Sequence, residues 1–380
     1  MTHYKYRLMA PGPTPVPEKV LIKMAEPIIH HRTAAFEAIV AEVKENLKWL
    51  YQTKDDVLVF AASGTGAMEG CITNLLSKND KALVVDGGKF GERWWKICKA
   101  YGIAHDVIKV EWGKAVDPRL IEEKLKSADY RAVYIQASET STGVYHPVKE
   151  IAAIVKKYPN TALVVDAITA LGVVNLPTDE WGLDCVVSGS QKALMLPPGL
   201  AFTSVSKKAW GLIEKSDIPK FYFDFKREKK AIDENTTAYT PAVSLIIGLN
   251  EVLRSMKAMG LEGIFKKHEQ IARACREGLK GMGLKLYAPE APSNAVTAVY
   301  SPEGMEAGKI VKGLRDQFNM TIAGGQDQAK GKIFRIGHLG HYDPMDIVSV
   351  LSAVEITLLK NGHKLELGKG VGAALQVLAS

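Results

Sequence analysis

One lysine stands where an enzyme could use it. Lys192 follows the apolar run 185–187 and the small residues 188–190, and the turn 197–199 closes the segment before another apolar run. Open α/β sheets place ligands just beyond the carboxyl ends of such strands. Burial in a partly apolar pocket lowers the pKa of a lysine amine and makes it a nucleophile toward carbonyl carbons. This segment alone leaves a solvated loop lysine open as the alternative.

Two further positions suit a phosphate-bearing cofactor. Asp166 ends the apolar run 162–165, where an acid either caps a helix or accepts a hydrogen bond from a protonated pyridine nitrogen. The segment 63–70, SGTGAMEG, follows an apolar run and opens a helical pattern, so its amides and hydroxyls suit a phosphate. A dinucleotide-binding motif is the competitor, but its third glycine falls one residue late, and only Asp86 comes close to the expected acid. The sequence therefore favours a phosphate.

The elements that position these residues repeat along the chain. Short apolar runs alternate with helix-length segments, which indicates a mostly parallel sheet covered on both faces. The runs lie at 57–62, 82–85, 133–137, 162–165, 185–187 and 200–205. Because the polar and small clusters follow these runs, we expect them to converge on one edge of one sheet.

The chain divides into an arm, a large unit and a smaller one. The prolines of 11–17, PGPTPVP, exclude a helix or a central strand there. Thr33 is a plausible N-cap for an amphipathic helix, and two long helical patterns follow one another from 240 to 279. A strand, a helix, a strand and a helix are expected at 294–300, 304–318, 333–336 and 344–359. We predict an extended arm at 1–20, a large domain at 21–258 and a smaller C-terminal domain at 259–380.

Composition narrows the class of protein. The 380 residues carry 49 basic and 42 acidic side chains, and 47% are hydrophobic, which is ordinary for a globular protein. The densest basic run, 226–230, contains an acid and favours a solvated loop over a nucleic-acid surface. Four cysteines without metal-ligand spacing suggest reduced thiols in a cytoplasmic protein, and we expect no metal. No stretch has the length of a signal or membrane segment, so we expect no membrane contact.

The motifs together resemble a known family. The chain is similar over nearly its whole length to class V, fold type I, pyridoxal-phosphate aminotransferases, in particular the alanine:glyoxylate and serine:glyoxylate (serine:pyruvate) group. The motifs that carry this resemblance are PGPTPVP, SGTGAMEG, GGKFGERW, SETSTGV, VVDAITALG, SGSQKALMLPPG, YTPAVSL and FRIGHLG. The resemblance implies an α/β fold with a mostly parallel seven-stranded sheet in the large domain and a smaller α+β C-terminal domain. It also implies pyridoxal 5′-phosphate as the cofactor.

The resemblance also assigns roles to residues. By it, Lys192 forms the Schiff base with the cofactor, Asp166 pairs with the pyridine nitrogen, and Arg335 binds the α-carboxylate of the substrate. Phe90 takes the place of the aromatic residue that stacks on the ring, where many relatives carry tryptophan. Thr140 matches the hydroxyl residue near the phenolic oxygen. The residues that match the phosphate cradle are Gly64, Thr65, Gly66 and Gln191.

A homodimer is implied as well, because Thr240 resembles the residue that reaches the phosphate of the neighbouring subunit. Some relatives place a tyrosine phosphate ligand just upstream; the aligned position here is Thr237, with Tyr239 displaced by two residues. His338 and His341 follow the arginine strand, and we expect them to be bystanders.

The expected reaction is a ping-pong transfer of an amino group from alanine or serine to glyoxylate or pyruvate. An aspartate or other donor is the alternative, and a dicarboxylic donor needs a second cation, for which Arg32 and Arg93 are candidates. A cysteine desulfurase-like lyase and a non-catalytic regulatory subunit are alternatives of other classes. The four cysteines fall within predicted helices or a strand, which disfavours the desulfurase-like lyase. The presence of both Asp166 and Lys192 disfavours the non-catalytic subunit.

Overall fold

The computed structural model describes residues 5–380 and confirms the α/β fold with a mostly parallel large sheet. Seven strands lie in the order β2-β10-β9-β8-β5-β3-β4, and β10 alone runs antiparallel to both of its neighbours. The strands are β2 (Asp56–Phe60), β3 (Lys81–Asp86), β4 (Ala104–Lys109), β5 (Ala132–Gln136), β8 (Ala162–Asp166), β9 (Cys185–Gly189) and β10 (Ala201–Val205). Those that carry the site are buried along their whole length, as expected for a sheet covered on both faces.

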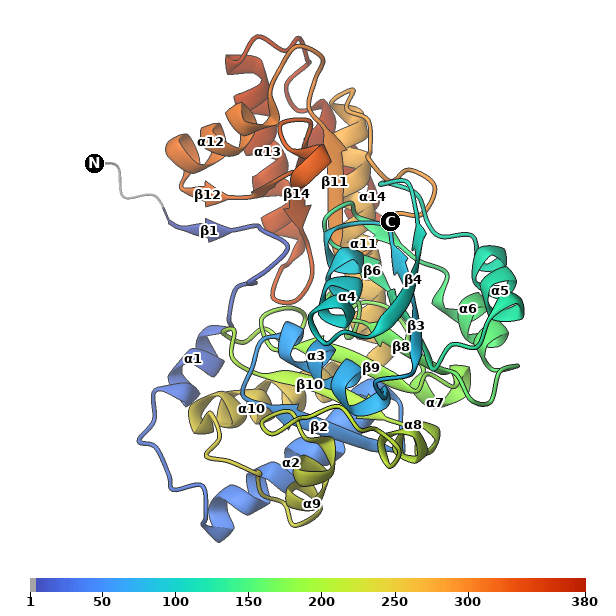
Figure 1. The fold of residues 1–380 in the computed structure, drawn as a ribbon. Helices are drawn as coiled ribbons and strands as arrows, with labels where there is room; N and C mark the ends of the chain where they lie inside the picture. Colours follow the sequence, from blue (N-terminus) through green and yellow to red (C-terminus); the bar gives the residue numbers. More distant parts are fainter. Residues whose placement is uncertain (1–4) are drawn as a thin grey trace.

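Helices cover this sheet (Figure 1). Thr33 caps α2 as predicted, because its hydroxyl accepts a hydrogen bond from the Phe36 amide at 3.4 Å. The helices up to the end of this unit are α2 (Ala34–Tyr51), α3 (Gly64–Leu75), α4 (Lys89–Ala100), α5 (Pro118–Ser127), α6 (Val148–Val155), α7 (Thr178–Trp181), α8 (Lys207–Ile213), α9 (Phe225–Asp233) and α10 (Val243–Met259). A small hairpin of β6 (Ser138–Glu139) and β7 (Val144–Tyr145) follows β5.

The C-terminal part has its own sheet and core. An antiparallel sheet in the order β11-β14-β13 packs with helices above the large sheet in Figure 1. Its elements are α11 (Leu261–Gly281), β11 (Val296–Tyr300), α12 (Ala307–Phe318), β12 (Met320–Thr321), β13 (Ala323–Gly324), the 3₁₀ turn η1 (Asp327–Ala329), β14 (Ile333–Gly337), α13 (Pro344–Lys360) and α14 (Lys369–Ala379). Within α11, Ile264 packs in the core of the large sheet and Ile271 in the C-terminal core. The helix therefore links the two cores, and the predicted boundary at 258/259 stays a prediction.

The N-terminal segment differs from an arm that is extended throughout. Part of the predicted arm, residues 1–4, lies outside the described residues. Strand β1 (Arg7–Leu8) pairs in parallel with β12, far along the chain, and α1 (Glu18–Met24) begins directly after Pro17. The prediction of an extended arm is therefore wrong for residues 18–20, which are helical. Proline explains the start of the helix, because a fixed φ is compatible with the position that precedes the first helical turn.

Among residues 5–380, no helix combines the length and the apolar character that crossing a bilayer requires.

Candidate active site

Lys192 lies just after β9, and its side chain is buried, with 9% of the residue exposed. Its Nζ donates a hydrogen bond to the carbonyl oxygen of Pro11 at 2.7 Å, and its own carbonyl oxygen accepts one from the Thr14 hydroxyl at 2.8 Å. Burial lowers the pKa of this amine to about 8, and the charge of Asp166 opposes the shift. A lysine in this state exchanges protons near neutral pH, which the solvated-loop alternative does not provide.

Asp166 ends β8 at the same edge of the sheet and is 4% exposed. Its Oδ1 accepts a hydrogen bond from the Ile168 amide at 2.9 Å. Burial raises the pKa of this carboxyl to about 7, while the positive charges of Arg93 and Lys192 lower it. The group therefore needs a cationic or donating partner to remain ionised at neutral pH.

Arg335 reaches the site from the C-terminal sheet. It is buried on β14, where Nη1 donates to the carbonyl oxygen of Thr140 at 2.9 Å, and Nε and Nη2 both donate to that of Gly324 at 3.0 and 2.8 Å. Burial lowers the pKa of its guanidinium to about 10, and the charge of Glu139 opposes this. Since a guanidinium has five N–H donors, two remain for a ligand beyond these three contacts. Thr140 also shares a 2.7 Å hydrogen bond with Thr169.

The glycine-rich segment and Gln191 come together beside the lysine. A Cβ atom built on Gly189 would lie 3.1 Å from Gln191 Oε1 and 3.6 Å from the amide nitrogen of Gly64. Gln191 Oε1 is buried and has no hydrogen-bond partner among the described residues. A Cβ on Gly64 would lie 2.3 Å from Ile168, and one on Gly66 would lie 2.7 Å from Ala62. The space beside α3 thus depends on glycine and offers polar atoms to a ligand.

Glu139 is a site residue that the sequence analysis missed. It is fully buried, and its carboxylate accepts hydrogen bonds from the amides of Phe90, Gly91 and Ser141 and from the Ser141 hydroxyl. The first two amides belong to the N-terminus of α4, where a carboxylate is favoured by the helix dipole. Burial raises the pKa of Glu139, and these hydrogen bonds oppose the shift. The residue therefore fixes Phe90 and the loop that carries Thr140.

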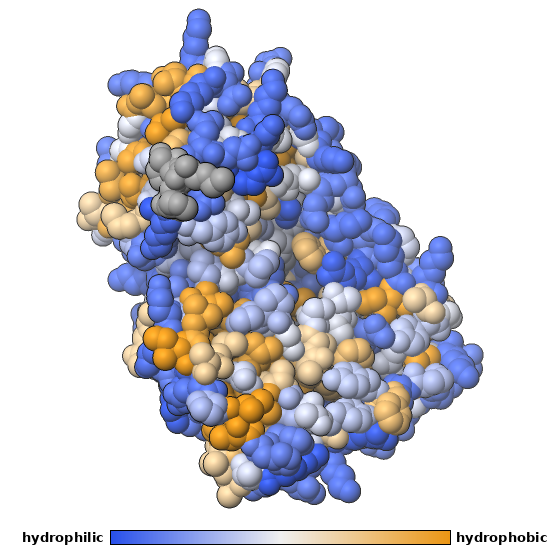
Figure 2. All heavy atoms as spheres, turned by 90° about the vertical axis from the view of Figure 1, so that its left-hand side faces the viewer, coloured by the Kyte–Doolittle hydropathy of each residue, from blue (hydrophilic) through white to orange (hydrophobic). Residues whose placement is uncertain are grey.

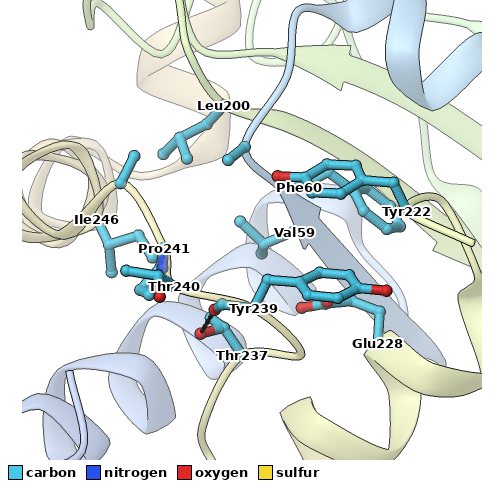
Figure 3. A pocket seen from close by; sticks show the side chains of 12 residues that line it. Val59, Phe60, Leu200, Tyr222, Glu228, Thr237, Tyr239, Thr240, Pro241 and Ile246 are labelled. Atoms are coloured by element: carbon cyan, nitrogen blue, oxygen red, sulfur yellow. Dashed lines mark hydrogen bonds between the residues drawn. The ribbon is translucent and has the colours of Figure 1, made fainter.

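Thr240 lies in a different pocket (Figure 3). Glu228 and Tyr239 also line this pocket, whereas Lys192 and Asp166 do not. The Thr237 hydroxyl donates to the carbonyl oxygen of Tyr239 at 2.7 Å. The Tyr239 hydroxyl in turn donates to the carbonyl oxygen of Phe221 at 2.8 Å and accepts from Arg227. The side chains of Thr237 and Tyr239 are thus both engaged by neighbours around this pocket.

The two arginines considered for a second cation are separated by the fold. The exposed Arg32 donates from Nη1 to the Thr236 hydroxyl at 2.9 Å. Arg93 is half-buried on α4, and its charge lowers the pKa of both Asp166 and Lys192. Of these two arginines, Arg93 alone therefore acts electrostatically on Asp166 and Lys192.

The histidines near Arg335 have structural surroundings. His338 is fully buried, with Nε2 at 2.8 Å from the Thr297 hydroxyl and Nδ1 at 3.0 Å from the carbonyl oxygen of Asn294, and burial lowers its pKa to about 3. His341 Nε2 lies 3.9 Å from a carboxylate oxygen of Glu18 at the surface.

All four cysteines are free and buried, and burial raises the thiol pKa of Cys98 and of Cys275 to about 12. Such thiols are poor nucleophiles at neutral pH. Among residues 5–380, no group of three His, Cys, Asp or Glu side chains is placed to hold a metal ion.

The site offers a buried amine, a buried carboxyl and a polar glycine-lined space at one sheet edge. This set fits a cofactor with an aldehyde, a basic ring nitrogen and a phosphate. The amine suits the aldehyde, and the carboxyl becomes ionised beside a protonated ring nitrogen. The backbone N–H groups at the glycine-rich start of α3, together with the side-chain NH₂ of Gln191, suit the phosphate.

The family match and two of three relatives, which are named aminotransferases, agree with this fit. Residues 8–348 match the family described as "Aminotransferase class-V". The chain is 45% identical to the "Soluble hydrogenase 42 kDa subunit" of Anabaena cylindrica over 99% of both chains. It is 36% identical to the L-aspartate–glyoxylate aminotransferase of Paracoccus denitrificans, over 97% of this chain and 94% of the relative. The chain is also similar to the crystal structure of ureidoglycine–glyoxylate aminotransferase from Bacillus subtilis. The match extends over 100% of both chains, with 29% identity and a TM-score of 0.95.

Proposed function

This chain belongs to the class V aminotransferases, which use pyridoxal 5′-phosphate, and on that premise we propose that it moves the amino group of alanine or serine to glyoxylate or pyruvate. The observation that carries the proposal is the closeness of three charged residues from two sheets. Lys192 and Asp166 lie at the edge of the large sheet, and Arg335 lies on β14 of the C-terminal sheet. The charges of Asp166 and Arg335 both act on the pKa of the Lys192 amine. Glyoxylate also appears in the names of the Paracoccus and Bacillus relatives.

Each half of the reaction requires a proton to be moved at the substrate Cα. Pyridoxal phosphate supplies a ring that withdraws electrons from that carbon and carries the amino group between the two half-reactions. Lys192 would hold the cofactor through its amine and would move the proton at the substrate Cα, for which an amine of pKa about 8 is suited. Asp166 would accept a hydrogen bond from the ring nitrogen and so favour its protonated form. The second half-reaction uses the same residues in reverse, which gives ping-pong kinetics.

The remaining residues orient the reactants. Arg335 binds the substrate carboxylate with its two remaining N–H donors, and its contact with Thr140 ties that carboxylate to the large sheet. Thr140 would lie near the phenolic oxygen of the cofactor, and Phe90 would stack on its ring. Gly64, Thr65, Gly66 and Gln191 would hold the phosphate.

We also propose a cytoplasmic homodimer in which Thr240 completes the phosphate site of the partner subunit. The exposed Thr240 and its pocket are separate from the Lys192 site, which is compatible with a role in the other subunit.

Figure 2 shows hydrophobic groups on the lower half of one face. Exposed large hydrophobic side chains of the N-terminal region and of the loop before α9 include Leu21, Ile22, Ile28 and Phe221. Free buried cysteines suit a reducing compartment.

The decisive experiment is a half-reaction screen. Purified protein loaded with pyridoxal phosphate is mixed separately with alanine, serine, aspartate and glutamate, and the absorbance of the cofactor is followed as its aldehyde form converts to the amine form. We expect conversion with alanine or serine and re-conversion on adding glyoxylate or pyruvate. Absence of conversion with all four amino acids would refute the proposed transaminase.

A further inference from the structure

The guanidinium of Arg93 is held from two sides at the edge of the candidate site. Its Nη1 donates a 3.0 Å hydrogen bond to the Thr65 hydroxyl, at the start of α3. Its Cζ lies 4.9 Å from the centre of the Phe90 ring, one turn earlier on α4. A cation above an aromatic face is favourable, so both contacts fix the position of the charge.

This positive charge has no acidic partner in the part of the chain that the structure describes. The neighbouring Glu92 pairs with Lys89 and Lys96 instead. The charge lowers the pKa of both Asp166 and Lys192, so the guanidinium lies near these two residues of the site. Beyond its contact with Thr65, the guanidinium keeps N–H donors that an anion at the start of α3 could accept. The arrangement therefore points to an anion that the protein itself does not provide.

We infer that this anion is the phosphate of the cofactor, and that Arg93 is its main cationic ligand; the inference rests on the proposed function. Because the Thr65 hydroxyl accepts a hydrogen bond from Arg93, its own proton is free to donate to a phosphate oxygen. Thr65 also lies in the first turn of α3, where the Ser63 side chain caps no amide. Helix dipole, hydroxyl and guanidinium then act on the same dianion.

The assignment has a consequence for the amino donor. A dicarboxylic donor needs a cation for its side-chain carboxylate in addition to Arg335. If Arg93 is committed to the phosphate, it cannot serve that carboxylate, and the exposed Arg32 lies with Thr236 instead. The inference therefore favours a monocarboxylic donor such as alanine or serine over aspartate.

The test compares pyridoxal phosphate with pyridoxal, which lacks the phosphate. Dissociation constants of both are measured by titrating cofactor-free Arg93→Gln and wild-type protein. Loss of one charge-assisted contact should weaken binding of pyridoxal phosphate by about 10- to 100-fold, while binding of pyridoxal changes by less than about threefold. Inorganic phosphate should compete with pyridoxal phosphate less well in the variant. Lys96→Gln, on the next turn of α4, is the matched control and should behave like wild type.

Other outcomes overturn the inference. If Arg93→Gln weakened the binding of pyridoxal phosphate and of pyridoxal equally, Arg93 would only position Phe90. Unchanged binding of pyridoxal phosphate with a raised KM for aspartate would assign Arg93 to a donor carboxylate. Arg93→Lys, which keeps the charge, should recover most of the affinity and serves if the glutamine variant does not fold. Failure of the proposed function is distinct, because wild-type protein would then bind cofactor without converting any amino acid.

Discussion

Replacing Asp166 by asparagine should remove the activity but stabilise the cofactor-free protein, by an amount that grows as the pH rises from 5 to 8. Burial raises the pKa of Asp166 from 3.8 to about 7. The stability that this group contributes is therefore fully present below its unfolded pKa and is lost as the pH rises toward 7. Asparagine has no charge to desolvate, and its side-chain oxygen can keep the hydrogen bond from the Ile168 amide.

The size of the effect follows from the shift. A rise from 3.8 to about 7 corresponds to about 4 kcal/mol, at about 1.4 kcal/mol per pKa unit. Asp166→Asn should exceed wild type by about 1.5 kcal/mol at pH 5 and about 4 kcal/mol at pH 8. The lowered pKa of Lys192 has the opposite pH dependence, and it falls further in Asp166→Asn because the Asp166 charge that opposes the lowering is removed.

The assay is urea unfolding of cofactor-free protein at a fixed concentration between pH 5 and 8. Asp184→Asn is the matched control: Asp184 is also buried, but it pairs with Lys208 at 2.8 Å and accepts hydrogen bonds from Leu163 and Ser206, so its replacement should destabilise. Added pyridoxal phosphate should stabilise wild type more than Asp166→Asn. Equal stability of wild type and Asp166→Asn at pH 8 would refute the desolvated carboxyl and the cost attributed to it.

Three further substitutions test the surroundings of the site. Gly12→Ala places a Cβ atom 2.3 Å from Lys192 Nζ at a φ of +135°, so turnover in a steady-state assay should fall by about 100-fold; near-normal turnover would contradict the packing of the N-terminal segment. Glu139→Gln puts an amide NH₂ among N–H donors, and urea unfolding should show a loss of about 2–3 kcal/mol, with Glu139→Asp recovering part of it. Arg335→Lys loses the planar fork, so the KM for the amino acid should rise by about 10- to 100-fold with a smaller change in kcat; an unchanged KM would exclude Arg335 as the carboxylate ligand.

The large sheet could be read from the sequence because its central strands are apolar on both faces. Strand β4 (AHDVIK) was missed, since it is an edge strand whose first residue is exposed and whose pattern is mixed. Helix α14 was not predicted either, because five of its eleven residues are glycine or alanine and it is held by packing against α11. In both β4 and α14, tertiary contacts rather than the local sequence pattern determine the secondary structure.

The site was predictable where a residue type is tied to a strand end, as for Asp166 and Lys192. Glu139 looked like one polar residue among several in SETSTG, and only its burial against the start of α4 reveals it. The spacing of three between Phe90 and Arg93 indicates a shared helix face, but the contact with Thr65 depends on how two helices meet. The Pro11 carbonyl bound to Lys192 joins positions 181 residues apart, which no local pattern contains.

The route of the N-terminal segment has a consequence for the order of assembly. Residues near the start of the chain pair with Met320 and Thr321, hydrogen-bond to Gly337 through the Met9 carbonyl, and surround Lys192. Residues 7–9 therefore find these partners only after the C-terminal sheet has been synthesised. Contacts of such long sequence separation form slowly because loop closure must come first. The large sheet can thus form well before the N-terminal segment reaches Lys192, so the reactive amine acquires its final surroundings only after the C-terminal sheet has formed.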